Sequence, residues 1–130
     1  MIKSQPRSLE VKGVSHGTAP IPMGARVSNM IFSSGIAGKD PATDQLPTDV
    51  AAQAKFAFQN MVALLAAGGA TPNQVAKMTV FIKDESARAP INEEWLKLYP
   101  DPHDRPARHT LTYDLRGGML LQLEVVAVIS

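Results

Sequence analysis

Apolar residues recur at steps of three and four in two segments of the chain, the spacing that gives an α-helix one apolar face. The longer segment covers residues 49–67, with Thr48 as a candidate N-cap and Gly68-Gly69 as a stop signal. The second covers residues 86–99 and ends before Pro100. The sequence therefore predicts two amphipathic helices.

Five further segments alternate between apolar and polar residues or carry short apolar runs, as β-strands do. They cover residues 8–12, 26–35, 75–83, 107–115 and 119–129. A turn at residues 116–118, Arg-Gly-Gly, joins the last two, which we expect to pair as neighbours. The order β-β-α-β-α-β-β predicts one α+β domain over residues 1–130, with both helices packed on one face of a sheet.

The last predicted strand is apolar on both sides. One side is expected to meet the helices and consists of Leu121, Leu123, Val125, Ala127 and Ile129. The other side carries Leu120, Gln122, Glu124, Val126 and Val128. This second side is more apolar than a sheet face bare to water usually is, and no further helix remains to cover it. We therefore expect a homo-oligomer in which sheet faces pack together.

Composition narrows the class of protein. With 13 basic and 12 acidic residues the net charge is +1, which gives no positive field for nucleic acid. The chain has no cysteine, so disulfides and thiol chemistry are excluded, and its three histidines lack metal-ligand spacing. The first residues lack the apolar core of a signal peptide, and no apolar run reaches the roughly 20 residues of a membrane span. We expect a cytoplasmic protein with no cofactor, metal, membrane or nucleic-acid partner.

The stretch "DRPARHTLTYDLRGG" places Arg108 near the start of a predicted strand. If the more apolar side of that strand faces the helices, Arg108 and Thr110 lie on the second sheet face with Gln122 and Glu124. A half-buried arginine needs an anionic partner. Glu124 is one candidate, in a structural ion pair. The other is a ligand carboxylate, which the planar guanidinium binds through two hydrogen bonds. The pattern leaves both open.

Several segments in order resemble signature segments of the Rid family of RidA/YjgF-type proteins, also known as endoribonuclease L-PSP or translation inhibitors. They are "NMIFSSG", "VAAQAKFAFQNM", "TVFIKD", Asn92, "RPAR" and "LEVVAV". The resemblance covers nearly the whole chain. It implies a chorismate-mutase-like α+β fold with a mixed sheet, and a homotrimer with clefts between subunits. It further implies that Arg108 holds a substrate carboxylate while reactive enamines or imines are hydrolysed to ketoacids and ammonia.

The chain departs from the active deaminases of that family at three positions. Their tyrosine in the loop after the first strand matches Ile21, and their cysteine after the arginine matches Thr110. Their glutamate on the last strand matches Gln122, whose amide has no useful basicity. Candidate replacements for the missing carboxylate are Glu124, and His109 or His16 if the loops bring them in.

Two functions follow as alternatives. One is hydrolytic deamination of a small enamine or imine carboxylate, similar to 2-aminoacrylate or 2-aminomuconate. Gln122, Glu124 and His109 are then the catalytic candidates, and the substrate is bound by Arg108, Ser34, Gly35, Thr110, Asn92 and Ile21. The other is a non-catalytic trimer that binds metabolite carboxylates or acts as a stress protein. A ribonuclease is the weakest reading, because the surface lacks the aromatic and basic groups that bind RNA.

Overall fold

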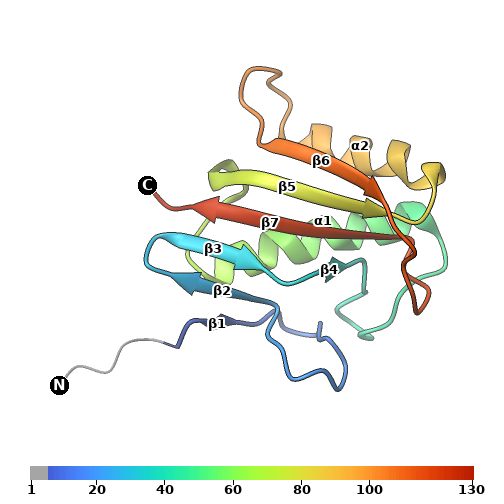
Figure 1. The fold of residues 1–130 in the computed structure, drawn as a ribbon, viewed down its shortest axis with the longest axis horizontal. Helices are drawn as coiled ribbons and strands as arrows, with labels where there is room; N and C mark the ends of the chain where they lie inside the picture. The colour runs from blue at the N-terminus through green and yellow to red at the C-terminus, as the bar shows by residue number, and fades with distance from the viewer. Residues whose placement is uncertain (1–5) are drawn as a thin grey trace.

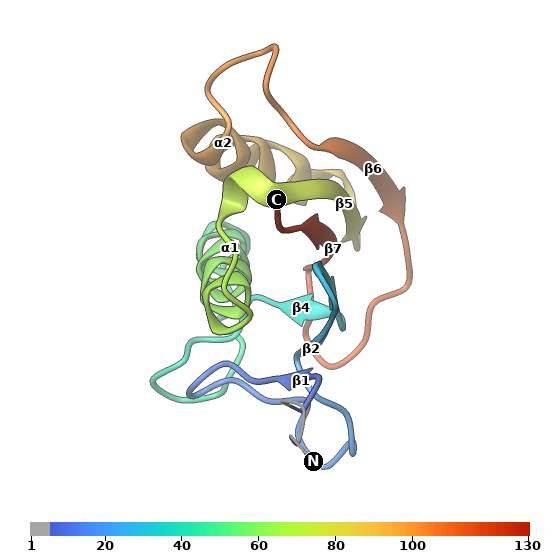
Figure 2. The same ribbon diagram turned by 90° about the vertical axis from the view of Figure 1, so that its left-hand side faces the viewer.

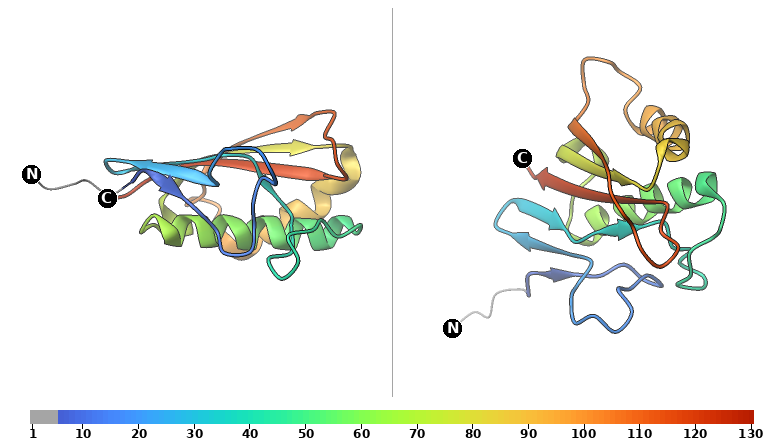
Figure 3. Two further views of the ribbon diagram at one scale, coloured as in Figure 1. Left: turned by 90° about the horizontal axis from the view of Figure 1, so that it is seen from below. Right: turned by 45° about the vertical axis from the view of Figure 1, so that its right-hand side comes forward.

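The computed structural model describes residues 6–130 and shows a seven-stranded mixed sheet with two helices on one face (Figures 1 and 3). The other face has no helix over it, as the view from below in Figure 3 shows, and we call it the open face. The α+β class and the placement of both helices on one side are confirmed. The strands are β1 (Ser8–Leu9), β2 (Gly24–Val27), β3 (Met30–Ser33), β4 (Ile36–Ala37), β5 (Val75–Ile82), β6 (Ala107–Thr112) and β7 (Leu121–Val128).

The sheet order is β1-β2-β3-β7-β5-β6, with β4 continuing the β3 side of β7. Only β5 and β6 pair in parallel, and α2 makes the crossover between them. β7 therefore lies in the middle, with β5 on one side and β3 and β4 on the other (Figure 1). This central position explains why the helix side of β7 is buried along its length, at Leu121, Leu123, Val125 and Ala127.

The segment at residues 26–35, predicted as one strand, is a hairpin in the structure. β2 and β3 pair through Val27 and Met30, and the turn between them holds Ser28 in the left-handed region, at φ 56°. Serine and asparagine at this turn gave no strong signal, since hairpin turns of this kind favour glycine. β4 was predicted as loop, because two residues are too short a strand to show alternation.

The prediction that the last two strands are neighbours is also wrong. β5 lies between β6 and β7, so residues 113–120 cross the end of β5 instead of closing a hairpin. Backbone hydrogen bonds fix the crossing: Tyr113 N–H donates to the Ile82 carbonyl, and Lys83 N–H donates to the Leu120 carbonyl. β6 is consequently an edge strand. Its more apolar side, with Leu111, faces away from the helices, so Arg108 lies on the opposite side of the sheet from the one expected.

Helix α1 (Val50–Ala67) begins at Asp49, whose side chain accepts a hydrogen bond from Ala52 N–H at 3.0 Å. The cap is thus one residue later than the predicted Thr48. The helix ends at Gly68, where a Cβ would come within 2.5 Å of the Ile31 side chain, so only glycine fits. α1 is long and apolar enough to pass a composition test for a membrane span, but its buried face, including Met61 and Leu64, packs on the sheet (Figure 2).

Helix α2 (Arg88–Leu98) follows a single 3₁₀ turn, η2 (Glu85–Ala87), so the predicted helix at 86–99 starts in a different helical geometry. A second short turn, η1 (Pro72–Gln74), precedes β5. The inner face of α2 buries Ile91 and Trp95, and the Trp95 ring meets Tyr99 edge-on at 4.9 Å. Burial raises the pKa of Tyr99 to about 12, and its hydroxyl donates to the Pro72 carbonyl at 2.9 Å.

The two sides of β7 are as predicted. The helix side is the centre of the core, with Leu121, Leu123 and Ala127 fully buried and Val125 2% exposed. The open face carries Gln122, Glu124 and Val126, which are half-buried. Strand pairing adds apolar neighbours to this face: Phe32 lies opposite Val126 and is 44% exposed. The open face is thus an uncovered apolar surface of the single subunit.

Candidate active site

The residues expected to form a site fall into two groups in the subunit. Arg108, Thr110 and Asn92 lie at one edge of the molecule, on β6 and α2. Ile21, Gly35 and Gln122 line a cavity at the start of β7. We call the first group the arginine edge and the second the cavity.

The expectation that Arg108 shares a face with Gln122 and Glu124 is wrong. In the parallel pair β5·β6, Arg108 lies beside Met78, whose side chain is fully buried under the helices. In the pair β5·β7, Glu124 lies beside Thr79 on the open face. Because neighbours in a register share a side of the sheet, Arg108 is on the helix side and Glu124 is on the open side. The structural ion pair between them is therefore not formed within the subunit.

Arg108 is half-buried and held on a tryptophan. Its guanidinium carbon lies 5.1 Å from the centroid of the Trp95 ring, and its Nε–H donates to Thr110 Oγ at 3.1 Å. Burial, and to a smaller extent the nearby charge of Arg88, lower the pKa of Arg108. Among residues 6–130 the guanidinium makes no ion pair, so its outer N–H groups are available for an anion. The contact with Trp95 and the bond to Thr110 hold the guanidinium in place before any ligand arrives.

Asn92 stands three residues before Trp95 on α2, one turn of the helix away, and is exposed. Thr110 follows Arg108 on the same side of β6 and is half-buried. The arginine edge therefore combines a fixed cation, a hydroxyl and an amide beside it. These groups suit a carboxylate with further polar atoms near it.

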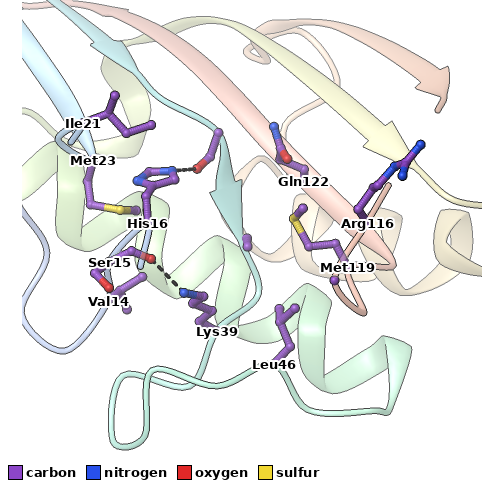
Figure 4. A pocket seen from close by; sticks show the side chains of 13 residues that line it. Val14, Ser15, His16, Ile21, Met23, Lys39, Leu46, Arg116, Met119 and Gln122 are labelled. Carbon is purple, nitrogen blue, oxygen red and sulfur yellow. Dashed lines mark hydrogen bonds between the residues drawn. The ribbon is translucent and has the colours of Figure 1, made fainter. Parts of the chain in front are cut away.

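The cavity has a volume of about 420 Å³ and lies between residues 14–23, the start of β4 and the crossing segment 116–119 (Figure 4). Its polar lining is Ser15, His16, Lys39, Arg116 and Gln122. Its apolar lining includes Val14, Ile21, Met23, Leu46 and Met119. Gln122 reaches it from the open face, because β4 pairs with β7 so that Ala37 lies beside Gln122.

Gly35 and Gln122 are packed against each other at the cavity wall. A Cβ on residue 35 would lie 2.2 Å from Gln122 Nε2, so the amide occupies the space that any other side chain would need. The neighbouring Ser34 lies between β3 and β4 and binds the backbone of residues 22–23. Its hydroxyl donates to the Pro22 carbonyl at 2.8 Å, and its N–H donates to the Met23 carbonyl. The Ser34 hydroxyl hydrogen is thus used inside the fold, and only its oxygen lone pairs remain for a ligand.

The loop does bring His16 to the cavity. Its Nε2 lies 2.8 Å from the Gly35 carbonyl oxygen, and since a carbonyl only accepts, Nε2 carries the hydrogen. The basic nitrogen is then Nδ1, which is buried and has no partner among the described residues. His16 therefore positions the Gly35 peptide, and its basic atom is closed off from the cavity water.

Glu124 and His109 lie elsewhere. Both are on the open face, Glu124 in a small hollow with Phe32, Thr79 and Val126, and His109 on the exposed edge strand. Neither lines the cavity. Of the three catalytic candidates, Gln122 is therefore the one that lines the cavity.

The side chains that hold the cavity together were missed by sequence reasoning. Gln53 is fully buried on α1, donates to the Pro47 and Gly118 carbonyls at 2.7 and 3.0 Å, and accepts from Leu120 N–H at 2.9 Å. Asn60, also buried, donates to the Ala37 and Lys39 carbonyls. The available signal was their polar character on an apolar helix stripe. Trp95 is both part of the core and the support of Arg108.

No group of three potential metal ligands occurs in the described part of the chain. The groups present are the Arg108 guanidinium, the Gln122 amide at the end of an apolar cavity, and the buried Gln53 and Asn60 that support it. Such groups can hold a small carboxylate and a water.

Comparison with known proteins agrees with this geometry. The crystal structure of E. coli TdcF with bound serine matches with a TM-score of 0.85 at 29% identity, covering 95% of this chain and 99% of that one. The crystal structure of the E. coli YjgF gene product matches with a TM-score of 0.83 at 28% identity, covering 94% and 98%. The two helices on a mixed sheet thus define a subunit of the YjgF/RidA type.

The sequence relatives give the family. The Endoribonuclease L-PSP profile matches residues 19–129. The 2-iminobutanoate/2-iminopropanoate deaminase of Escherichia coli K12 is 28% identical over 124 residues, which are 94% of this chain and 97% of that protein. A RutC family protein of Pyrococcus abyssi is 32% identical over 116 residues, covering 84% and 90%. The chain belongs to the Endoribonuclease L-PSP family, as its sequence motifs predicted.

Proposed function

We propose that the protein hydrolyses reactive imines or enamines of small amino acids to ketoacids and ammonia. The observation that carries the proposal is Arg108, a half-buried guanidinium stacked on Trp95 with no carboxylate partner among the described residues. A cation placed in this way needs an anion from outside the subunit. The family adds support, since one relative is named a 2-iminobutanoate/2-iminopropanoate deaminase and another was crystallised with serine, which has a carboxylate.

The site is proposed to form between subunits of a homotrimer. Arg108 and Gln122 lie on opposite faces of one sheet, so a single chain cannot bring both to the same small ligand. The open face, with Phe32, Val126 and Val128, supplies an apolar surface for assembly. In this arrangement the arginine edge of one subunit closes the cavity of its neighbour. Ile21, 51% exposed in the subunit, becomes part of the wall.

Each group then has a distinct task. The Arg108 fork binds the substrate carboxylate, Thr110 and Asn92 flank it, and the Gly35 backbone N–H of the neighbour donates a further hydrogen bond. Ser34 Oγ, whose hydrogen is committed to Pro22, accepts from the substrate nitrogen. Gln122 holds the water over the imine carbon. Such placement contributes to rate even without a base, because it replaces a collision by a fixed geometry.

The proposed reaction balances as a hydrolysis. Water adds to the C=N carbon of the iminium form, the C–N bond breaks after proton transfer to nitrogen, and ketoacid and ammonium leave. The proton lost by the water cannot go to Gln122, which is not basic, nor to His16 Nδ1, which is buried. It passes through solvent to the substrate nitrogen, so that both protons of the water end on the departing ammonium, and the proposed enzyme is weaker than one with a carboxylate at position 122.

A second function rests on the same glutamine. Without a base beside the cavity, the assembly would bind ketoacids and imino acids without turning them over. The absence of a base at Gln122 favours a binding protein. Arg108 would serve an enzyme and a binding protein equally. Binding and turnover must therefore be measured separately.

The test uses 2-aminoacrylate generated in situ and 2-aminomuconate. The wild-type protein is expected to accelerate their hydrolysis above the buffer rate, and Arg108→Ala to lose the acceleration while keeping the fold. Arg7→Ala, an exposed arginine far from both groups, is the matched control. Ketoacid binding by the wild type with a rate equal to buffer would establish the binding-protein reading. Unchanged binding in Arg108→Ala would refute both.

A further inference from the structure

The cavity is larger than a short-chain imino acid requires. Its volume of about 420 Å³ lies within the range of about 300–1,000 Å³ that is usual for pockets binding drug-sized ligands. A substrate whose carboxylate is held at the mouth by Arg108 therefore leaves space deeper in. The side chains that line this space determine which substrates the proposed deaminase prefers.

The charged lining of the cavity has one sign. Lys39 and Arg116 are its two permanently charged side chains, and its lining contains no aspartate or glutamate. Leu46, Met119 and Ala37 provide apolar wall in the same region (Figure 4). A wall of this kind accommodates a short carbon chain that ends in an anion.

Lys39 is held in place. Its ammonium donates to the Ser15 carbonyl at 2.8 Å and lies 3.2 Å from an oxygen of Asp44, which leaves a third hydrogen. The Asp44 carboxylate is bound by the Ser15 hydroxyl and N–H, which lower its pKa together with Lys39. Asp44 lines a neighbouring hollow, which Lys39 also borders, and is absent from the cavity wall.

Arg116 lies across the cavity from Lys39, on the segment that crosses the end of β5 (Figure 4). Its guanidinium is 3.7 Å from the Asp114 carboxylate, and the two side chains are 87% and 79% exposed. A surface pair of this geometry holds its partners weakly. The guanidinium is therefore free to turn toward an anion in the cavity.

We propose that Lys39 and Arg116 form a subsite for a second carboxylate, so that the preferred substrates are imino acids carrying a further carboxylate at the end of a short carbon chain. The proposal rests on the proposed function, in which Arg108 holds the first carboxylate. It goes further by assigning the far end of the cavity to a defined chemical group.

The test compares two ketoacids of equal chain length, 2-oxoglutarate and 2-oxovalerate, by calorimetry on the assembled protein. They differ by a carboxylate in place of a methyl group at the far end. Charge-assisted hydrogen bonds predict that 2-oxoglutarate binds at least about tenfold more tightly. Arg116→Gln and Lys39→Met should each reduce this ratio, with the arginine variant free of any effect on the Ser15–Asp44 contacts. Lys55→Met, on the exposed side of α1, is the control and should keep the wild-type ratio.

The outcomes separate the two proposals. Equal affinities in the wild type, or a ratio that both variants leave unchanged, would overturn the second-carboxylate subsite while Arg108 binding stands. Failure of both ketoacids to bind would overturn the proposed function and this subsite with it. A tenfold preference that falls in either variant, with Lys55→Met unchanged, supports it.

Discussion

The guanidinium of Arg108 lies over Trp95, with its central carbon 5.1 Å from the ring centroid. Trp95 is the one tryptophan of the chain and is 8% exposed. An anion on Arg108 therefore changes the environment of a single fluorophore. The pair joins a buried core residue to the group that is proposed to bind substrate.

Fluorescence titration follows from this contact. Adding a ketoacid such as pyruvate to the wild type is expected to change the Trp95 emission in a saturable way, because the bound carboxylate alters the field of the guanidinium over the ring. The same titration of Arg108→Ala should be flat, and Arg7→Ala should titrate as the wild type does. A saturable change that persists in Arg108→Ala would place the ligand elsewhere.

Replacing Trp95 by phenylalanine tests its supporting role. The substitution keeps an aromatic ring in the core but weakens the cation–π contact, which contributes about 0.5–2 kcal/mol. We expect KM to rise roughly three- to tenfold with kcat little changed. If kcat falls as KM rises, and Tm falls by a large amount as well, Trp95 acts through the stability of the fold alone.

Assembly is tested on the open face. Val126→Asp places a charge opposite Phe32 without entering the core, so the subunit should stay folded while the oligomer dissociates. Sedimentation velocity checks the mass and circular dichroism the fold. Ala63→Asp, on the exposed side of α1, is the control and should remain assembled. A wild-type protein that sediments as a folded monomer in dilute buffer would refute the assembly outright.

The buried glutamine of α1 gives a prediction for stability. Gln53→Leu leaves the Pro47 and Gly118 carbonyls and the Leu120 N–H without their partner, and an unsatisfied buried group costs about 1–3 kcal/mol. We expect a loss of about 3 kcal/mol or more in the free energy of unfolding, measured by denaturant titration. Gln59→Leu, exposed on the same helix, should change it by less than about 0.5 kcal/mol.

The sequence predicted those parts of the fold whose periodicity is strong. Both helices, β5 and the two sides of β7 follow directly from apolar spacing, because each is long and buried on a defined side. The β2–β3 turn at Ser28 was missed because its left-handed residue is not glycine. The path of residues 113–120 was also missed, since a Gly-Gly turn fits a hairpin as well as a crossing over β5.

The site prediction failed on the side assigned to β6, because the more apolar side of this strand, with Leu111, lies on the open face. Once β6 pairs with β5, Arg108 takes the side of Met78 and moves away from Glu124. Sequence motifs named the arginine, glycine and glutamine, but alternation within one strand cannot show which strand lies beside it. The separation of Arg108 from Gln122 emerged only from strand pairing.

The identity of residue 122 gives a test of the proposed chemistry. Gln122→Glu adds a carboxylate that can accept the proton of the attacking water, and general bases contribute up to about 10²–10⁴-fold. Turnover of simple imines should rise if the wild type is limited by the missing base. No increase, despite intact ketoacid binding, would show that another group already serves or that the protein is a binder.

The central claim is that one subunit supplies Arg108 and its neighbour supplies the cavity, and mixing two inactive variants tests it most directly. Arg108→Ala removes the first half and Ala37→Phe fills the second, since Ala37 lines the cavity. Each is inactive alone on this account. Refolded together in equal amounts, they form random trimers in which one interface of each mixed trimer is intact, so about a quarter of wild-type activity should return. A mixture no more active than the separate variants would contradict the shared site.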